Sequence, residues 1–406
     1  MGLKVWYVSK YISPPGRGTV GGRGYLLMKE LALIGHDITL ITSNSNHLAD
    51  PPTLDGNYLI QDVDGMRLCW VRTVKYSVAK SVRRILSWIH FEWRLFCLPK
   101  EQFSKPDVVV ISSLSLLTVL NGLFWRMRYK CHLIFEIRDI WPLTLTEEGG
   151  FNSANPIIKL LGFVERLGYR YSDAIIGTMP NLCEHVKQVL GYSKKTFFIP
   201  MGVDTSVSIS SEALPNHFEK YYCPTGKFIV AYVGSIGTTN ALETFFKCAS
   251  IMKEEPAVHF LVVGDGDLRE TFRLEYAHLQ NLTFAPRIRK EMVQSLLSKC
   301  DLLYFSVHES KVWKYGQSLN KVIDYMLAGK PIVASYTGYP SMINEAACGT
   351  YVPAGDEIAL KKEITRYHKM NVYERYRLGA RGKAWLKKNR SYKKLANDFQ
   401  NILLNL

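Results

Sequence analysis

Four polar side chains recur at helical spacing late in the chain, and their types suit binding of a phosphorylated ligand. They are Gln317, Asn320, Lys321 and Asp324. Apolar residues occupy the opposite stripe (Leu319, Val322, Ile323 and Met326), which predicts a helix that begins near Ser318 and ends at Gly329. The N-terminus of this helix would offer unpaired amides and partial positive charge to a diphosphate. A solvated polar face would show the same spacing, so both interpretations stay open.

A glycine-rich turn follows the first predicted strand. Residues 14–24 read Pro-Pro-Gly-Arg-Gly-Thr-Val-Gly-Gly-Arg-Gly and lead into a predicted helix that runs toward Leu33. Glycines such as Gly21 and Gly22 let the backbone approach a ligand closely, and the helix N-terminus suits a phosphate or a sugar hydroxyl. The turn is neither a GxGxxG motif nor a Walker loop. A purely structural turn is the alternative.

Ionisable residues also follow the fifth predicted strand. Arg138 and Asp139 lie in the run 135–142, and Glu147 and Glu148 occupy the next loop. At the carboxyl edge of a parallel sheet a carboxylate can bind sugar hydroxyls or a proton in transit. Arg138 and Asp139 are therefore candidate catalytic residues, and a surface ion pair between them is the alternative.

The elements that position these residues are strands alternating with helices, which is the pattern of parallel sheets with crossover connections. Strands are expected at residues 4–8, 38–42, 67–71, 108–111, 132–135, 174–176 and 196–199, and again at 228–233, 258–263, 282–284, 302–305 and 331–334. The predicted fold class is α/β, with Rossmann-like doubly wound domains at 1–204 and 227–387 and a linker at 205–226. A C-terminal helix at about 388–406 is expected to pack back on the first domain. Ligands bind at the carboxyl ends of such strands, so we expect the chemistry in a cleft between the domains.

Composition limits the class of partner. The 406 residues carry a formal net charge of +15, which points to nucleic acid, a membrane surface or a phosphorylated small molecule. No nucleic-acid-binding signature is recognisable, so we expect no nucleic acid partner. The eight cysteines lack the spacing of a disulfide framework or zinc site, so we expect a reducing cytosol and no metal. We expect no signal peptide, and the apolar residues 108–127 divide into a strand and a helix rather than a membrane span.

The run from Tyr315 to Ile332 resembles the donor-site segment of family 4 glycosyltransferases, particularly bacterial enzymes that build O-antigens and capsules, of the N-acetylfucosamine-transferase-like type. Supporting matches are Gly21-Gly22, Gly35-His36, residues 138–142, 199–204 and 263–266, and Cys348-Gly349. The resemblance implies a GT-B fold, whose two domains face each other across a cleft. It also implies retaining transfer from a nucleotide sugar without an obligatory metal or other bound cofactor.

The resemblance also assigns residues and shows two departures. Asp324 falls on the second acidic position of the E-x7-E motif, which contacts the ribose, but Gly316 occupies the first. Many relatives carry Arg and Lys after the first strand of the second domain, whereas residues 234–240 contain no base. Lys321 is the first candidate to compensate the diphosphate, and Arg287 and Lys290 are alternatives. The expected donor-binding set is Gly21, Gly22, Gly234, Arg287, Lys290, Gln317, Ser318, Asn320, Lys321 and Asp324, and the expected catalytic set is Arg138, Asp139 and Lys321.

A basic amphipathic helix is predicted at residues 80–100. One apolar stripe comprises Val82, Ile85, Leu86, Ile89 and Trp93; Trp88, Phe91 and Leu95 widen it, and Lys80, Arg83, Arg84 and Arg94 supply charge. This combination indicates docking to an anionic bilayer, with Phe124, Trp125, Arg126 and Arg128 as a second contact. A helix buried on two sides is the alternative.

These observations predict a cytoplasmic glycosyltransferase, peripheral on the inner face of the bacterial plasma membrane. We expect transfer of an N-acetylated hexosamine or 6-deoxy-hexosamine from a UDP-sugar to a lipid-linked or oligosaccharide acceptor in surface polysaccharide biosynthesis. A nucleotide-sugar epimerase or hydrolase on the same fold is the nearest alternative, and a non-catalytic nucleic-acid-binding protein is a more distant one.

Overall fold

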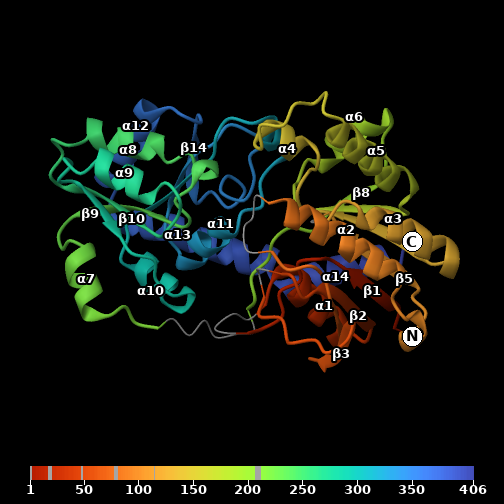
Figure 1. Ribbon diagram of the computed structural model, residues 1–406. Coiled ribbons are helices and arrows are strands. Elements are labelled where there is room, and N and C mark those ends of the chain that lie inside the picture. The colour runs from red at the N-terminus through yellow and green to blue at the C-terminus, as the bar shows by residue number, and fades with distance from the viewer. Residues whose placement is uncertain (1, 17–20, 47–48, 77–80, 114, 206–211) are drawn as a thin grey trace. The chain divides into compact units, whose positions relative to one another are not determined.

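The computed structural model describes residues 2–16, 21–46, 49–76, 81–113, 115–205 and 212–406 (Figure 1). The chain forms two compact units, residues 1–202 with 392–406, and residues 203–391. Each contains a mainly parallel sheet with helices on both faces. The expected α/β architecture of two Rossmann-like domains is confirmed.

The sheet of the first unit has the strand order β3-β4-β2-β1-β5-β6-β7-β8. Its strands are β1 Lys4–Val8, β2 Asp37–Ser43, β3 Tyr58–Val63, β4 Met66–Val71, β5 Val108–Ser112, β6 His132–Ile137, β7 Ala174–Gly177 and β8 Thr196–Phe198. The helices are α1 Arg23–Leu33, α2 Val82–Phe96, α3 Thr118–Tyr129, α4 Leu143–Glu147, α5 Pro156–Tyr171, α6 Leu182–Leu190 and α14 Tyr392–Leu403, with a short 3₁₀ turn at Lys100–Gln102. The predicted division of residues 108–127 into strand and helix is confirmed by β5 and α3.

Strand β3 is absent from the sequence-based expectations. It pairs antiparallel with β4 as the edge of the sheet. The connecting residues Asp64 and Gly65 have φ angles of +50° and +74°. An Asp-Gly pair with two positive φ angles is the usual two-residue hairpin turn. The sequence therefore carried a signal for this hairpin that periodicity alone missed.

The sheet of the second unit has the order β11-β10-β9-β12-β13-β14. Its strands are β9 Phe228–Val233, β10 Val258–Val263, β11 Leu282–Ala285, β12 Leu302–Ser306, β13 Ile332–Ser335 and β14 Gly349–Val352. The helices are α7 Asn216–Tyr222, α8 Glu243–Ile251, α9 Arg269–Glu275, α10 Val293–Ser298, α11 Asn320–Ala328, α12 Glu357–Lys369 and α13 Val372–Arg390, with 3₁₀ turns at Thr238–Asn240, Lys290–Met292 and Lys311–Tyr315. Helix α7 lies inside the stretch expected as a linker, of which residues 206–211 are outside the described residues.

The last helix completes the core of the first unit. Helix α14 packs beside α1 on one face of the sheet (Figure 1), and Leu395, Phe399 and Ile402 join the same apolar cluster as Leu27 and Leu31. The chain thus returns to the first unit after completing the second.

Helix α2 exposes a narrower apolar surface than the sequence predicts. The residues expected to widen its docking stripe are mostly internal: Phe91 and Leu95 are buried, and Trp88 is half-buried with its indole donating to Tyr11 Oη at 2.9 Å. Trp125, expected as a second contact, is also buried. Phe91, Leu95 and Trp125 are therefore wrong candidates for a membrane contact, because core packing removes them from the surface. Lys80, another residue of that prediction, lies outside the described residues.

Candidate functional site

Lys321 is a partly buried cation of the second unit whose ammonium is held by two side chains. It lies in the first turn of α11, and its Nζ donates to Asn240 Oδ1 at 2.5 Å and to Tyr232 Oη at 3.1 Å. The ammonium also lies 4.7 Å from the centroid of the Tyr232 ring, a cation–π geometry. Tyr232 Oη in turn donates to the carbonyl of Ser235 at 2.5 Å. The structure thus joins Lys321 to the loop after β9, although Tyr232 and Asn240 were not singled out from the sequence.

The surroundings of Lys321 lower the pKa of its ammonium. Burial lowers its pKa from 10.5 to about 8 because desolvation penalises the charged form. Among the described residues no carboxylate pairs with this ammonium. A partly desolvated cation that is held by neutral partners is available to an incoming anion.

Helix α11 begins slightly later than the spacing predicted. Its first residue is Asn320, its N-cap residue is Leu319, and no side chain caps this end. Gln317 therefore precedes the helix and does not share its polar stripe. Its side chain is only 2% exposed, and its Oε1 accepts the backbone N–H of Leu319 at 3.1 Å. Ser318 is half-buried in the same loop, whereas Asn320 is exposed.

Two other predicted residues form an ion pair. Lys290 Nζ lies 2.5 Å from Asp324 Oδ2, and Gln294 Nε2 donates to the Asp324 carbonyl at 3.1 Å. The Lys290 ammonium is thus already paired with a carboxylate, so Lys290 is a weaker candidate than Lys321 for the main diphosphate cation. Arg287 is exposed in the loop after β11.

The position of the absent acidic residue has an unusual backbone. Gly316 has φ +98° and ψ −177°, in a region that is essentially restricted to glycine. A glutamate at this position would be strained in the observed conformation. The departure from the E-x7-E motif is therefore a change in local backbone geometry as well as the loss of one carboxylate.

Glycines bring the loops after β9 and β10 into close contact. A Cβ on Gly264 would lie 1.9 Å from the carbonyl oxygen of Gly234, and a Cβ on Gly266 would lie 2.2 Å from that of Ile236. Side chains at these two positions are thus excluded by backbone atoms. The predicted donor residue Gly234 is itself close to Lys321, because a Cβ there would lie 3.8 Å from its Nζ.

A buried ion pair organises the carboxyl edge of the first sheet. Arg23 Nη1 lies 2.5 Å from Glu136 Oε1, and Tyr7 Oη donates to Glu136 Oε2 at 2.6 Å. Arg23 also donates to the carbonyls of Pro200 and Ile199 at 3.0 and 2.6 Å. Burial alone would raise the pKa of Glu136, but the charges of Arg23 and Arg138 and the two hydrogen bonds hold it below its usual value. This pair fixes the end of β6 beside the start of α1.

The two predicted catalytic residues of the first unit lie directly after β6. Ser113 Oγ accepts the backbone N–H of Arg138 at 2.9 Å, and Thr178 Oγ1 donates to the Arg138 carbonyl at 3.3 Å. The side chain of Arg138 is half-exposed, and Asp139 is exposed. Neighbouring strands thus hold the backbone while Asp139 stays accessible to a ligand.

The glycine turn at the start of α1 is the third predicted feature of this unit. Gly21 has φ +107°, and Gly22 is the N-cap residue without a side-chain cap. The Gly22 N–H donates to the Ser13 carbonyl at 2.7 Å. Residues 17–20 of the motif lie outside the described residues.

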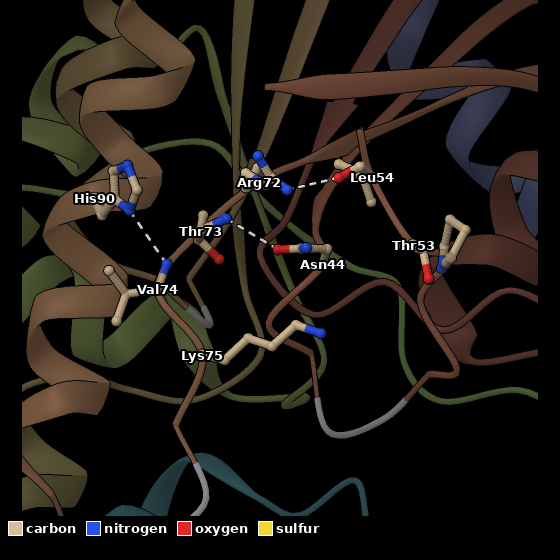
Figure 2. Close-up of a pocket in the computed structure, with 9 residues that line it drawn as sticks. Asn44, Thr53, Leu54, Arg72, Thr73, Val74, Lys75 and His90 are labelled. Atoms are coloured by element: carbon tan, nitrogen blue, oxygen red, sulfur yellow. Dashed lines mark hydrogen bonds between the residues drawn. The ribbon is translucent and has the colours of Figure 1, made fainter. Parts of the chain in front are cut away.

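A pocket of about 350 Å³ lies at the carboxyl ends of β2 and β4 (Figure 2). Its nine lining residues are Asn44, Pro52, Thr53, Leu54, Arg72, Thr73, Val74, Lys75 and His90. Arg72 donates to the Leu54 carbonyl at 2.7 Å, and the Lys75 side chain extends toward Thr53. Burial, Arg94 and Lys10 lower the pKa of His90, so Arg72 and Lys75 supply the positive charge. None of the nine is acidic, so the pocket favours an anionic group. No motif in the sequence predicts this pocket.

Comparison with known proteins agrees with this architecture. The family model described as Glycosyltransferase Family 4 matches residues 25–207, and the model described as Glycosyl transferases group 1 matches residues 227–369. Together with the two Rossmann-like sheets, these matches define a glycosyltransferase of the GT-B fold. The chain belongs to the family 4 glycosyltransferases. No curated protein matches it.

Solved structures share the fold over the whole chain. Sucrose-phosphate synthase from Thermosynechococcus elongatus is 17% identical with a TM-score of 0.73, covering 99% of this chain and 98% of that one. An Escherichia coli structure described as trehalose-6-phosphate bound with UDP-2-fluoro glucose is 11% identical, with a TM-score of 0.75 and 99% of each chain covered. Anabaena HepE in complex with UDP and glucose is 12% identical, with a TM-score of 0.64 and 100% of each chain covered. At these identities the likeness shows the fold alone.

Proposed function

We propose that this glycosyltransferase uses a UDP-sugar donor, whose diphosphate binds Lys321 and the N-terminus of α11. The observation that carries the proposal is the partly desolvated Lys321 ammonium, which is held by neutral partners at an uncapped helix end. Two similar structures are described as bound with UDP-2-fluoro glucose and with UDP and glucose, which supports UDP over other nucleotides.

The donor site divides into a phosphate side and a ribose side. Lys321 and the amides of α11 would bind the diphosphate. Asp324 would accept hydrogen bonds from the ribose hydroxyls, and the Lys290 ammonium, 2.5 Å away, holds that carboxylate in place. Gly234, Ser318 and Asn320 would complete the contacts. Arg287, exposed after β11, would be a second cation for the diphosphate. Gln317 would act by holding the loop before the helix, because its side chain is buried.

The reaction proposed is retaining transfer on the front face of the sugar. The bond between the anomeric carbon and the phosphate oxygen breaks while the acceptor oxygen bonds to the anomeric carbon on the same face. The leaving diphosphate gains negative charge, and Lys321 stabilises that charge. The diphosphate then takes the proton of the acceptor hydroxyl. In the first unit, Gly21 and Gly22 would approach the sugar, and Arg138 and Asp139 would orient the sugar or the acceptor. Near-normal turnover by Asp139→Asn would remove Asp139 from this mechanism.

The acceptor proposed is a lipid-linked saccharide in bacterial surface polysaccharide assembly, reached at the inner face of the plasma membrane. Polyprenyl-diphosphate sugars are anionic, and the net charge of +15 and the basic pocket favour such an acceptor. An N-acetylated hexosamine or 6-deoxy-hexosamine is the donor sugar proposed, on the resemblance to O-antigen enzymes.

A thermal-shift panel tests the donor. UDP and UDP-sugars should raise the unfolding temperature in proportion to the logarithm of concentration over Kd, whereas GDP and ADP should act only at much higher concentration. Stabilisation by GDP at lower concentration than UDP would contradict the UDP assignment. An epimerase or hydrolase would instead release or isomerise the sugar without acceptor at a rate comparable with transfer, which chromatography of the products would detect.

A further inference from the structure

Helix α2 packs on the first unit through the buried side chains of Phe91 and Leu95 and also through polar contacts. Lys10 Nζ donates to Ser87 Oγ at 2.8 Å, and the Glu92 carboxylate accepts from Thr118 Oγ1 at 2.7 Å and from Asn121 Nδ2 at 2.8 Å. Burial raises the pKa of Glu92 to about 7, although its hydrogen bonds act to lower it. The raised pKa shows that this side of the helix is removed from water. In a surface helix of a globular protein the inward side is ordinarily the apolar one.

The outward side of α2 is apolar instead. Six large side chains on it are between 47% and 72% exposed: Val82, Ile85, Leu86, Ile89, Trp93 and Phe96. Their spacing of three and four residues places them on one stripe. The neighbouring α3 adds exposed Leu120 and Met127, and a contact between Phe96 and Phe124, with ring centroids 5.1 Å apart, joins the two helices. These residues of α2 and α3 are called the α2–α3 face below.

A contiguous apolar face of this extent indicates an interaction site rather than ordinary surface. Core packing does not explain it, because the exposed side chains point away from the sheet that α2 and α3 cover. The stripe that the sequence placed on this helix is therefore present, while Phe91 and Leu95, which were expected to widen it, are inside.

The charges of the two helices indicate the kind of partner. They carry five arginines, Arg83, Arg84, Arg94, Arg126 and Arg128. Arg126 is paired with Asp173, whereas Arg83 and Arg128 are exposed. Their only acidic residue is Glu92, which is turned inward. Two copies of such a basic face would repel each other, which disfavours self-association through it. An anionic bilayer offers negative headgroups for the arginines and acyl chains for the apolar stripe.

We propose that the α2–α3 face docks the protein on an anionic phospholipid bilayer, with α2 lying in the interface plane. The 15 residues of α2 span about 22 Å, less than the hydrocarbon thickness. Among the described residues no helix is long and apolar enough to cross a membrane. The docking surface rests on the proposed function only in that a lipid-linked acceptor would lie in the same bilayer.

Vesicle co-sedimentation of the full chain tests the proposal. Large vesicles of phosphatidylcholine with a substantial fraction of phosphatidylglycerol should pellet the protein, and vesicles of phosphatidylcholine alone should pellet much less. The triple variant Ile85→Ser, Ile89→Ser, Trp93→Ser should weaken binding to the anionic vesicles at least about tenfold. Arg83→Gln with Arg128→Gln should weaken it several-fold at low salt and less at high salt.

A matched control keeps the result specific to this face. The triple variant Ile358→Ser, Tyr373→Ser, Tyr376→Ser removes three comparably exposed apolar side chains from the second unit and should bind vesicles as the wild type does. The Trp93 indole, 62% exposed, should shift its fluorescence to shorter wavelength on vesicle binding. The difference between wild type and Trp93→Phe isolates that signal.

Several outcomes would overturn the proposal. Wild-type protein that ignores anionic vesicles, or a serine variant that pellets as well as wild type, would do so. Dimers that the serine variant converts to monomers, without vesicle binding, would assign the face to a second copy. Stabilisation by UDP, measured in parallel without vesicles, separates the two proposals. Protein that binds UDP but no vesicles would contradict only the docking proposal. Protein that binds vesicles but not UDP would contradict only the proposed UDP-sugar donor.

Discussion

The depressed pKa of Lys321 predicts that donor binding weakens as pH rises above 8. Only the protonated amine attracts the diphosphate, and burial lowers its pKa to about 8 in the free protein. At pH 7 about nine-tenths of Lys321 would be charged, and at pH 9 about one-tenth. Because apparent affinity scales with the binding-competent fraction, the Kd for UDP should be about tenfold higher at pH 9 than at pH 7.

Substitution of Lys321 separates its charge from other effects of pH. A hydrogen bond to a charged group contributes about 1.5–3 kcal/mol, so Lys321→Met should raise the Kd for UDP about 10- to 100-fold and abolish the rise above pH 8. In Lys321→Arg the side chain stays charged throughout this pH range. The Kd of this variant for UDP should therefore not change with pH, whatever its value at pH 7. Lys299→Met removes an exposed lysine that pairs with Glu219 in the same unit, and it should leave the profile unchanged.

Isothermal titration with UDP between about pH 7 and about pH 9 measures these profiles, because the nucleotide phosphates are largely ionised there. If Lys321→Met kept the wild-type Kd at pH 7 and the same rise with pH, Lys321 would not hold the diphosphate. A titrating group elsewhere would then be responsible.

Three further outcomes follow from the structure. Gly316→Glu, which restores the E-x7-E spacing, should destabilise the protein by about 1–3 kcal/mol in urea because of its backbone geometry; an active variant of unchanged stability would contradict the assigned strain. Lys75→Ala should raise the KM for an anionic acceptor several-fold and leave the Kd for UDP unchanged; a changed Kd with an unchanged KM would remove the pocket from acceptor binding. Arg23→Met should cost about 3–5 kcal/mol at neutral pH because Glu136 is left buried and unpaired. The low pKa of Glu136 stabilises the fold above the ordinary glutamate value of about 4.3, and this contribution is lost as pH falls through the lower folded pKa, so Arg23→Met should cost least in acid, as thermal unfolding would measure.

The sequence by itself determined the elements and their order. Every strand expected from β-branched runs is present, because period and composition act over a few residues. The helix ended by Gly329 was predictable because a left-handed C-terminal residue favours glycine, and its φ is +68°. The edge strands β3 and β14 were missed: residues 58–63 are only partly buried, so their pattern is weak, and β14 is only four residues long.

Only the tertiary structure decided which of the candidate residues meet. Lys321 lies 81 residues from Asn240, and Lys290 lies 34 residues from Asp324, so neither contact has a local signal. The orientation of α2 was also beyond the sequence, because an amphipathic pattern defines two faces without saying which one is inside. Contacts from other elements, with Lys10 and Thr118 among the partners, hold the side with Ser87, Phe91 and Glu92 inward and leave the stripe from Val82 to Phe96 in solvent. Local periodicity thus specified the helix, and contacts between distant parts of the chain specified its environment.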